Sequence, residues 1–196
     1  MWKVNEIFHS LQGEGYYTGT ASVFIRLSGC NLRCDFCDTR HEEGTMMSLP
    51  EIVEQVMQYP KAPLIVLTGG EPSLWIDEEF VGGLKKMTGK RIAIETNGTH
   101  TLPYGIDWVT LSPKGGIGNS GDASVVLFKC DELKVVYLGQ DLTQYNNIVA
   151  THRYLQPCWT DDPEKRRHNL LATIQAVMDN PEWRLSLQTH RILGLK

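Results

Sequence analysis

Short apolar runs alternate with helix-like segments along most of the chain. Seven runs rich in Val, Ile and Leu predict strands at positions 21–28, 63–68, 91–95, 108–112, 132–137, 153–156 and 184–188. Start signals at Ser48, Asp77 and Asp162 predict three helices, and the glycine-rich segment 115–124 predicts a loop. This alternation, without an internal repeat or a linker, predicts a single α/β domain over residues 1–196.

Polar motifs follow six of the predicted strands at their carboxyl ends. In barrel-like α/β folds the active site assembles at this edge of the sheet, so the six motifs predict one site. They are Ser28-Gly29-Cys30, Thr68-Gly69-Gly70-Glu71-Pro72, Glu95-Thr96-Asn97-Gly98-Thr99, Ser112-Pro113-Lys114, Gln156-Pro157 and Gln188-Thr189-His190.

Composition and charge exclude some classes of function. The chain has 19 Lys and Arg against 23 Asp and Glu, a net charge of -4, which excludes a broad polybasic surface for nucleic acid. No apolar run approaches the roughly 20 residues of a membrane helix. The first residues also lack the layout of a signal peptide. We therefore expect a soluble, cytoplasmic protein with no nucleic-acid partner and no membrane partner.

Three of the five cysteines are clustered. Cys30, Cys34 and Cys37 form a C-x3-C-x2-C motif, whose three thiolates can hold three irons of a four-iron cluster and leave the fourth iron open. The alternative is a structural zinc site with His41 as the fourth ligand. Zinc leaves the glycine-rich turns elsewhere without a purpose, so the cluster is favoured. Cys130 and Cys158 receive no role from the pattern alone.

The cysteine motif, with Phe36 before its last cysteine and Gly69-Gly70-Glu71-Pro72 one strand later, resembles the radical S-adenosylmethionine superfamily. The resemblance implies a 4Fe-4S cluster on Cys30, Cys34 and Cys37, with S-adenosylmethionine on the open iron. The paired glycines suit a close approach of backbone to ligand. It also implies a truncated, open (β/α) partial TIM-type barrel with six to seven strands.

From Gln12 to the last residue, the order and spacing of the motifs resemble the 7-carboxy-7-deazaguanine synthase family. That resemblance implies conversion of 6-carboxy-5,6,7,8-tetrahydropterin to 7-carboxy-7-deazaguanine with loss of ammonia, in 7-deazapurine (queuosine-type) biosynthesis. It implies radical chemistry carried by the cofactors, with no side chain as a general base. An electron donor such as a flavodoxin and a homodimer are also implied.

The same resemblance implies three sets of site residues. Mg2+ is bound by the Thr39 hydroxyl, although a threonine there is otherwise an ordinary turn residue. The S-adenosylmethionine set is Phe36, Cys37, Asp38, Gly70, Ser112, Pro113, Lys114, Gln156, Pro157, Cys158 and Trp159. The substrate set is Leu11, Gln12, Gly13, Glu14, Arg26, Thr68, His190 and Lys196. Without the resemblance, Arg26 is interpreted as an outward-facing strand residue and Lys114 as a surface lysine. Cys158-Trp159 departs from the family pattern.

The last residues carry a further expectation. The segment 192–195 is apolar, so we expect the tail to dock rather than fray. The resemblance then implies that the α-carboxylate of Lys196 faces the pterin. Two other functions stay open at this point: an activating enzyme for glycyl-radical enzymes, and a zinc-stabilised binding module without catalysis.

Overall fold

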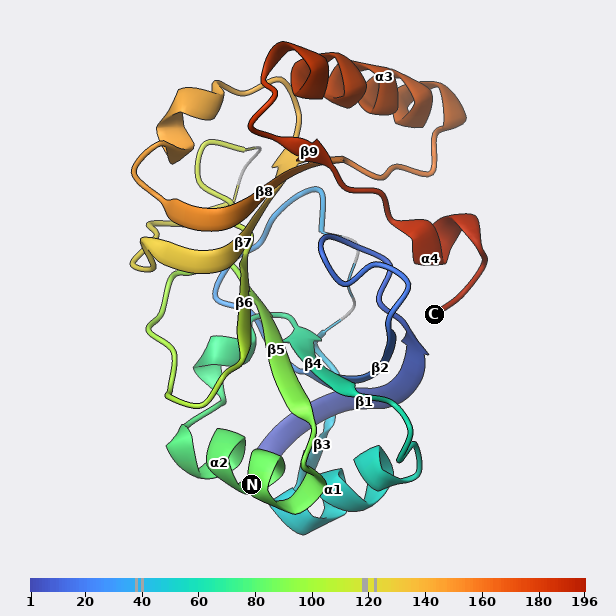
Figure 1. Cartoon of the computed structure of the whole chain (residues 1–196), viewed down its shortest axis with the longest axis vertical. Coiled ribbons are helices and arrows are strands. Elements are labelled where there is room, and N and C mark those ends of the chain that lie inside the picture. Colours follow the sequence, from blue (N-terminus) through green and yellow to red (C-terminus); the bar gives the residue numbers. More distant parts are fainter. Residues whose placement is uncertain (38, 40, 118–119, 122) are drawn as a thin grey trace.

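The computed structural model describes residues 1–37, 39, 41–117, 120–121 and 123–196. Within these residues one open sheet has the strand order β3-β1-β2-β4-β5-β6-β7-β8-β9 (Figure 1). The strands are β1 (Trp2–Leu11), β2 (Ala21–Leu27), β3 (Thr45–Met47), β4 (Leu64–Gly69), β5 (Arg91–Thr96), β6 (Trp108–Leu111), β7 (Lys129–Tyr137), β8 (Val149–Pro157) and β9 (Arg184–Leu185).

Seven of these strands, from β2 to β9 in the sheet, pair in parallel and correspond to the seven predicted runs. Two antiparallel strands extend the sheet on one side, because β1 pairs with both β2 and β3. The predicted open partial barrel is therefore confirmed, but the count of six to seven strands is too low. Strand β1 was not predicted because polar residues interrupt its apolar ones, so it has no continuous apolar run. Its outer neighbour β3 pairs with only part of it.

Four α-helices lie in the described residues: α1 (Leu49–Met57), α2 (Glu78–Thr88), α3 (Pro163–Asp179) and the short α4 (Thr189–Ile192). The predicted start signals are confirmed, since Asp77 accepts a hydrogen bond from Phe80 N at 2.8 Å and Asp162 accepts one from Glu164 N at 2.9 Å. Gly89 ends α2 with a φ of 66°, which favours glycine. Two 3-10 turns, η1 (Pro72–Leu74) and η2 (Leu142–Tyr145), follow β4 and β7.

Strand alternation sorts the side chains onto two faces. On β2, Val23, Ile25 and Leu27 belong to the core that also holds buried residues of α1 and α2, which lie at the lower end of Figure 1. The alternate residues Phe24 and Arg26 line a cavity on the other face. A second core involves β6, β7, β8 and α3. No described helix is both long and apolar enough to cross a membrane.

Candidate active site

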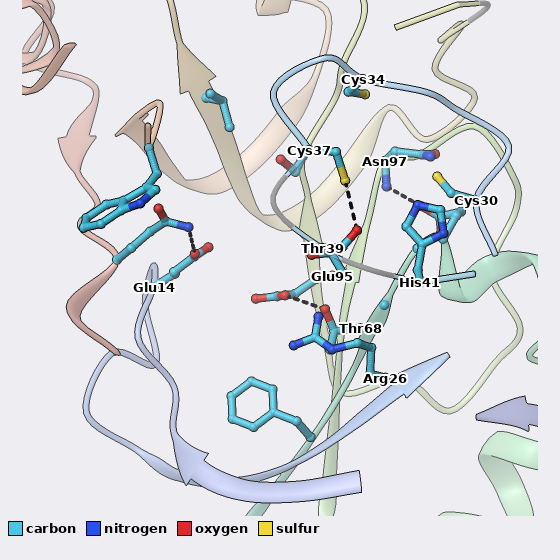
Figure 2. Close-up of a pocket in the computed structure, with 18 of the residues that line it drawn as sticks. Glu14, Arg26, Cys30, Cys34, Cys37, Thr39, His41, Thr68, Glu95 and Asn97 are labelled. Atoms are coloured by element: carbon cyan, nitrogen blue, oxygen red, sulfur yellow. Dashed lines mark hydrogen bonds between the residues drawn. The ribbon is translucent and has the colours of Figure 1, made fainter. Parts of the chain in front are cut away.

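A cavity of about 1030 Å³ opens at the carboxyl ends of the parallel strands. Its wall includes residues from all six polar motifs: Cys30, Thr68, Glu95, Ser112, Gln156 and His190 are examples. In Figure 2 the labelled cysteines lie on one side of the view, Glu14 lies on the opposite side, and Thr39, Glu95 and Thr68 lie between them. The parallel topology thus brings motifs that are far apart in sequence to one volume.

The cysteine triad, defined as Cys30, Cys34 and Cys37, lines the cavity as free thiols on one loop after β2. Leu32 N donates to Cys30 Sγ at 3.4 Å, and Cys37 N donates to Cys34 O at 3.0 Å. Burial raises the pKa of the Cys30 thiol, so its proton is retained at neutral pH until a metal displaces it.

His41, the fourth ligand of the alternative zinc site, lies on the same wall as the triad. Its carbonyl accepts a hydrogen bond from Gly29 N at 2.7 Å. Among the described residues, no three His, Cys, Asp or Glu side chains are grouped closely enough to hold one metal ion. This geometry does not choose between a zinc site and a four-iron cluster.

A glycine cradle, formed by Gly69 and Gly70, packs directly against the triad loop. A Cβ on Gly70 would lie 2.0 Å from Gly29 O, next to Cys30, and Gly69 has a φ of 136°. Two backbone hydrogen bonds fix the contact, from Gly70 N to Leu27 O at 3.1 Å and from Glu71 N to Gly29 O at 2.9 Å. Only a chain without side chains here lets the loop and the turn approach so closely.

Glu71 ties this cradle to the end of β5. Its buried carboxylate accepts hydrogen bonds from Thr96 Oγ1 and from Asn97 N, both at 2.7 Å. Asn97 Nδ2 in turn donates to Asn31 Oδ1 on the triad loop at 3.1 Å. The glycine cradle, the triad loop and the β5 motif therefore form one connected unit.

A network of ion pairs and hydrogen bonds occupies the Glu14 side of the cavity. Lys134 on β7 pairs with Glu14, from the loop after β1, and with Glu95 Oε1 at 3.3 Å. Glu95 also accepts hydrogen bonds from Gln12 Nε2 at 3.1 Å and from Thr68 Oγ1 at 3.0 Å. Predicted substrate residues from two segments, the loop after β1 and strand β4, thus meet in one network with Glu95 and Lys134.

The charges in this network are strongly coupled. Burial alone would raise the pKa of Glu14, but Lys134 and the hydrogen bonds from Lys134 and Gln188 outweigh burial and lower it to about 2. Burial would lower the pKa of Lys134, whereas the carboxylates of Glu14, Glu95 and Glu132 raise it. Glu14 and Lys134 therefore both stay ionised at neutral pH.

A second charged group surrounds Phe8, on β1. Arg26 Nε donates to Glu6 Oε1 at 2.8 Å, and Lys196 pairs with the same carboxylate. Both cations also lie over the Phe8 ring, with the Arg26 guanidinium carbon 5.5 Å and the Lys196 Nζ 5.1 Å from its centroid. Phe8 in turn stacks on Phe24. This wall of the cavity therefore holds two cations, Arg26 and the Lys196 ammonium, that are paired with the Glu6 carboxylate.

The tail docks, but not for the predicted reason. Ser10 donates a hydrogen bond to a main-chain oxygen of Lys196 at 2.8 Å, and Figure 1 places this end beside the strands near β1. The apolar side chains expected to drive docking point outward instead, with Ile192 66% and Leu193 62% exposed. Polar contacts at Lys196, and hydrogen bonds from Thr189 to Gly13 O, hold the segment.

Most of the predicted site residues line the cavity. Pro113 is buried outside its wall, and Asp38 lies outside the described residues. Cys158 and Trp159 do line it, and Trp159 lies between the guanidinium groups of Arg166 and Arg191 at 4.7 Å and 4.9 Å. A position on this wall does not show which ligand a residue binds, so the ligand assigned to each residue stays a prediction.

Comparison with known proteins decides the family. The model of the radical SAM superfamily matches residues 24–116. The chain is 52% identical to the 7-carboxy-7-deazaguanine synthase of Bacteroides thetaiotaomicron over 100% of both chains, and 36% identical to that of Bordetella pertussis over 99% of both. The chain belongs to the 7-carboxy-7-deazaguanine synthase family.

The solved structures agree with this family. The crystal structure of QueE from Escherichia coli superposes with a TM-score of 0.71 and 28% identity, covering 95% of this chain and 93% of that one. Streptococcus suis SuiB, at a TM-score of 0.54 and 15% identity, shares the fold alone. The family resemblance drawn from the motifs is therefore confirmed.

Several wall residues were given no role from the sequence. Glu95 and Gln188 stand inside motifs that point to the site, yet the motifs alone do not say which of their side chains face the cavity. Lys134 was missed altogether. Its signal is a lysine two residues after Glu132, a spacing that places both charges on one face of β7.

Proposed function

We propose that this chain converts 6-carboxy-5,6,7,8-tetrahydropterin to 7-carboxy-7-deazaguanine with loss of ammonia, as a radical S-adenosylmethionine enzyme of 7-deazapurine biosynthesis. The observation that carries the proposal is a single cavity with the cysteine triad on one side and the Glu14 network on the other. Membership of the 7-carboxy-7-deazaguanine synthase family supports the same reaction.

The triad would hold three irons of a 4Fe-4S cluster, and the glycine cradle would receive the amine of S-adenosylmethionine. Once bound, these cofactors supply the carbon-centred radical that removes a hydrogen atom from the pterin. The rest of the S-adenosylmethionine would contact Phe36, Ser112, Lys114 and the segment 156–159, all of which line the cavity. Ser112 accepts a hydrogen bond from Lys114 Nζ at 2.6 Å, which fixes that ammonium at the wall.

The pterin would lie between the two charged walls. Its ring edge presents adjacent N–H donors, for which the ionised Glu14 is an acceptor, while Gln12 offers an amide. Its carboxylate would face the Arg26 guanidinium, in the charged group around Phe8. Thr39, on the wall between them, would give one oxygen to Mg2+, with substrate and water supplying the others.

The chain's own contribution is to orient the pterin and to keep water from the radical. Glu14 and Lys134 serve orientation, because their side chains are only 14% and 7% exposed and each is held by its partner. A low-potential electron donor such as a flavodoxin, and a homodimer, complete the proposal from the family resemblance.

Anaerobic reconstitution of the cluster, followed by product analysis with the carboxypterin, tests this function. Wild type with S-adenosylmethionine, Mg2+ and a chemical reductant should form 7-carboxy-7-deazaguanine and one equivalent of ammonia. The Cys34→Ala variant, which lacks one predicted ligand, should form neither. Cleavage of S-adenosylmethionine without any pterin product would contradict the proposal and favour the activation of a protein substrate.

A further inference from the structure

Lys134 occupies the middle of the Glu14 network although no motif points to it. The residue lies on β7, two residues after Glu132, and its side chain is 7% exposed while still lining the cavity. A buried ammonium is costly unless carboxylates surround it. Here Glu14 and Glu95 supply two, and Glu132 on the same strand face adds a third negative charge nearby.

Three of the predicted substrate residues, Gln12, Glu14 and Thr68, are joined through this ammonium. Lys134 binds Glu14 directly, and Glu14 Oε1 also accepts a hydrogen bond from Gln188 Nε2 at 2.9 Å. On its other side Lys134 binds Glu95, which holds the amide of Gln12 and the hydroxyl of Thr68. One cation therefore fixes side chains from the loop after β1, from β4, β5 and the segment before α4.

Without Lys134, two nearby carboxylates would share a poorly solvated volume. Like charges at close range raise the pKa of at least one member, and burial raises it further. Two other basic side chains, Lys114 and His190, also line this cavity and interact electrostatically with Glu14. A protonated Glu14 would turn an O–H donor toward one N–H donor of the pterin edge and keep only its uncharged carbonyl oxygen as an acceptor for the other. One hydrogen bond would be lost and the remaining one would be weaker.

We propose that Lys134 is a positioning residue for the pterin: it keeps Glu14 ionised and holds the Glu14 and Glu95 carboxylates in place as acceptors for the ring N–H donors. This inference rests on the proposed function and adds a residue to it. Lys134 acts through the carboxylates and not on the reacting carbon. Its loss should therefore weaken pterin binding, and raise KM, more than it slows the step after binding.

The test measures the dissociation constant of the carboxypterin by anaerobic calorimetry, on reconstituted protein with S-adenosylmethionine bound, between pH 6.5 and 8.5. Wild type should bind with nearly constant affinity, because Glu14 is ionised throughout. Lys134→Met should bind more weakly, and its affinity should fall further by up to roughly tenfold per pH unit as the pH decreases. Lys134→Arg keeps the charge and should restore a flat profile.

Two further variants separate this role from a structural one. Lys129→Met changes an exposed lysine at the start of the same strand and should match wild type in affinity and pH profile. The double variant Glu14→Gln/Lys134→Met removes both charges, so it should bind weakly at every pH without a slope. Iron content and S-adenosylmethionine binding should stay at the wild-type level in all of them.

The possible failures are distinguishable. If wild type binds no carboxypterin, the proposed function falls and this inference falls with it. If wild type binds and Lys134→Met shows the same affinity and the same flat profile, only the role of Lys134 is overturned. Should Lys134→Met not fold, wild type still decides: a pH-dependent affinity that Glu14→Gln abolishes would show that Lys134 does not keep Glu14 ionised.

Discussion

Replacing Gly70 by alanine tests how the glycine cradle supports the cysteine triad. The added Cβ would lie 2.0 Å from Gly29 O and 2.5 Å from Gly29 C, where real contacts are essentially never below 3.0 Å. These are backbone atoms, which cannot rotate away as a side chain can. The triad loop must therefore move by about 1 Å or more relative to the cradle.

The size of the effect follows from the contacts that this movement disturbs. Overpacking costs about 1–3 kcal/mol, and each weakened hydrogen bond adds about 1 kcal/mol. Two such bonds hold the contact, from Gly70 N to Leu27 O and from Glu71 N to Gly29 O. We expect Gly70→Ala to lower the free energy of unfolding by about 3 kcal/mol, which corresponds to about 10 °C in Tm for a chain of this size.

Thermal unfolding of the cluster-free protein measures this loss, and iron content after reconstitution measures the displacement of Cys30. Gly82→Ala is the matched control: Gly82 lies in α2 with open space around its Cβ, so alanine should stabilise the helix by about 0.5–1 kcal/mol. Wild-type stability and full iron loading in Gly70→Ala would refute the reasoning.

Three further changes give separate expectations. Alanine at any member of the cysteine triad should abolish iron loading, whereas Cys130→Ala, at a buried thiol whose burial raises its pKa to about 12, should leave the measured iron content unchanged. Thr39→Ala should slow turnover partially and weaken its dependence on Mg2+, because substrate and water supply the other oxygens; an unchanged Mg2+ titration would contradict the assignment. Glu14 has a pKa of about 2 when folded against 4.5 unperturbed, so its stabilisation is complete above pH 4.5 and is lost as the pH falls toward 2. Urea unfolding of the cluster-free protein should therefore show wild type losing up to about 3 kcal/mol more than Glu14→Gln across that interval, and equal losses would contradict the role of Lys134 as its partner.

The parallel strands could be predicted because their apolar runs are short, rich in branched residues and separated by capped helices. Ser48, Asp77 and Asp162 act locally, so their role can be read within four residues. Strand β1 lacks such a run, since it lies toward the side of the sheet and half of its residues are polar. Its position depends on pairing with β2, which its own pattern does not reveal.

Part of the candidate site could likewise be predicted from the sequence, and part could not. The cysteine spacing and the paired glycines identify the cofactor side because those residues are close together in sequence. The Glu14–Lys134 pair joins residues 120 positions apart, so only the fold brings them together. The tail shows the limit of composition: its apolar residues suggested docking, but Lys196 is held by Ser10 and Glu6 through polar groups.

The most direct test of one cavity for cluster, cofactor and pterin is an anaerobic crystal structure of the reconstituted chain with S-adenosylmethionine and the carboxypterin. The sulfurs of Cys30, Cys34 and Cys37 should each bind one iron, with the methionine group on the fourth. The pterin ring edge should lie within hydrogen-bond distance of Glu14, and its carboxylate should face Arg26. An iron bound by His41 or Cys158, or a pterin outside the cavity, would contradict the account.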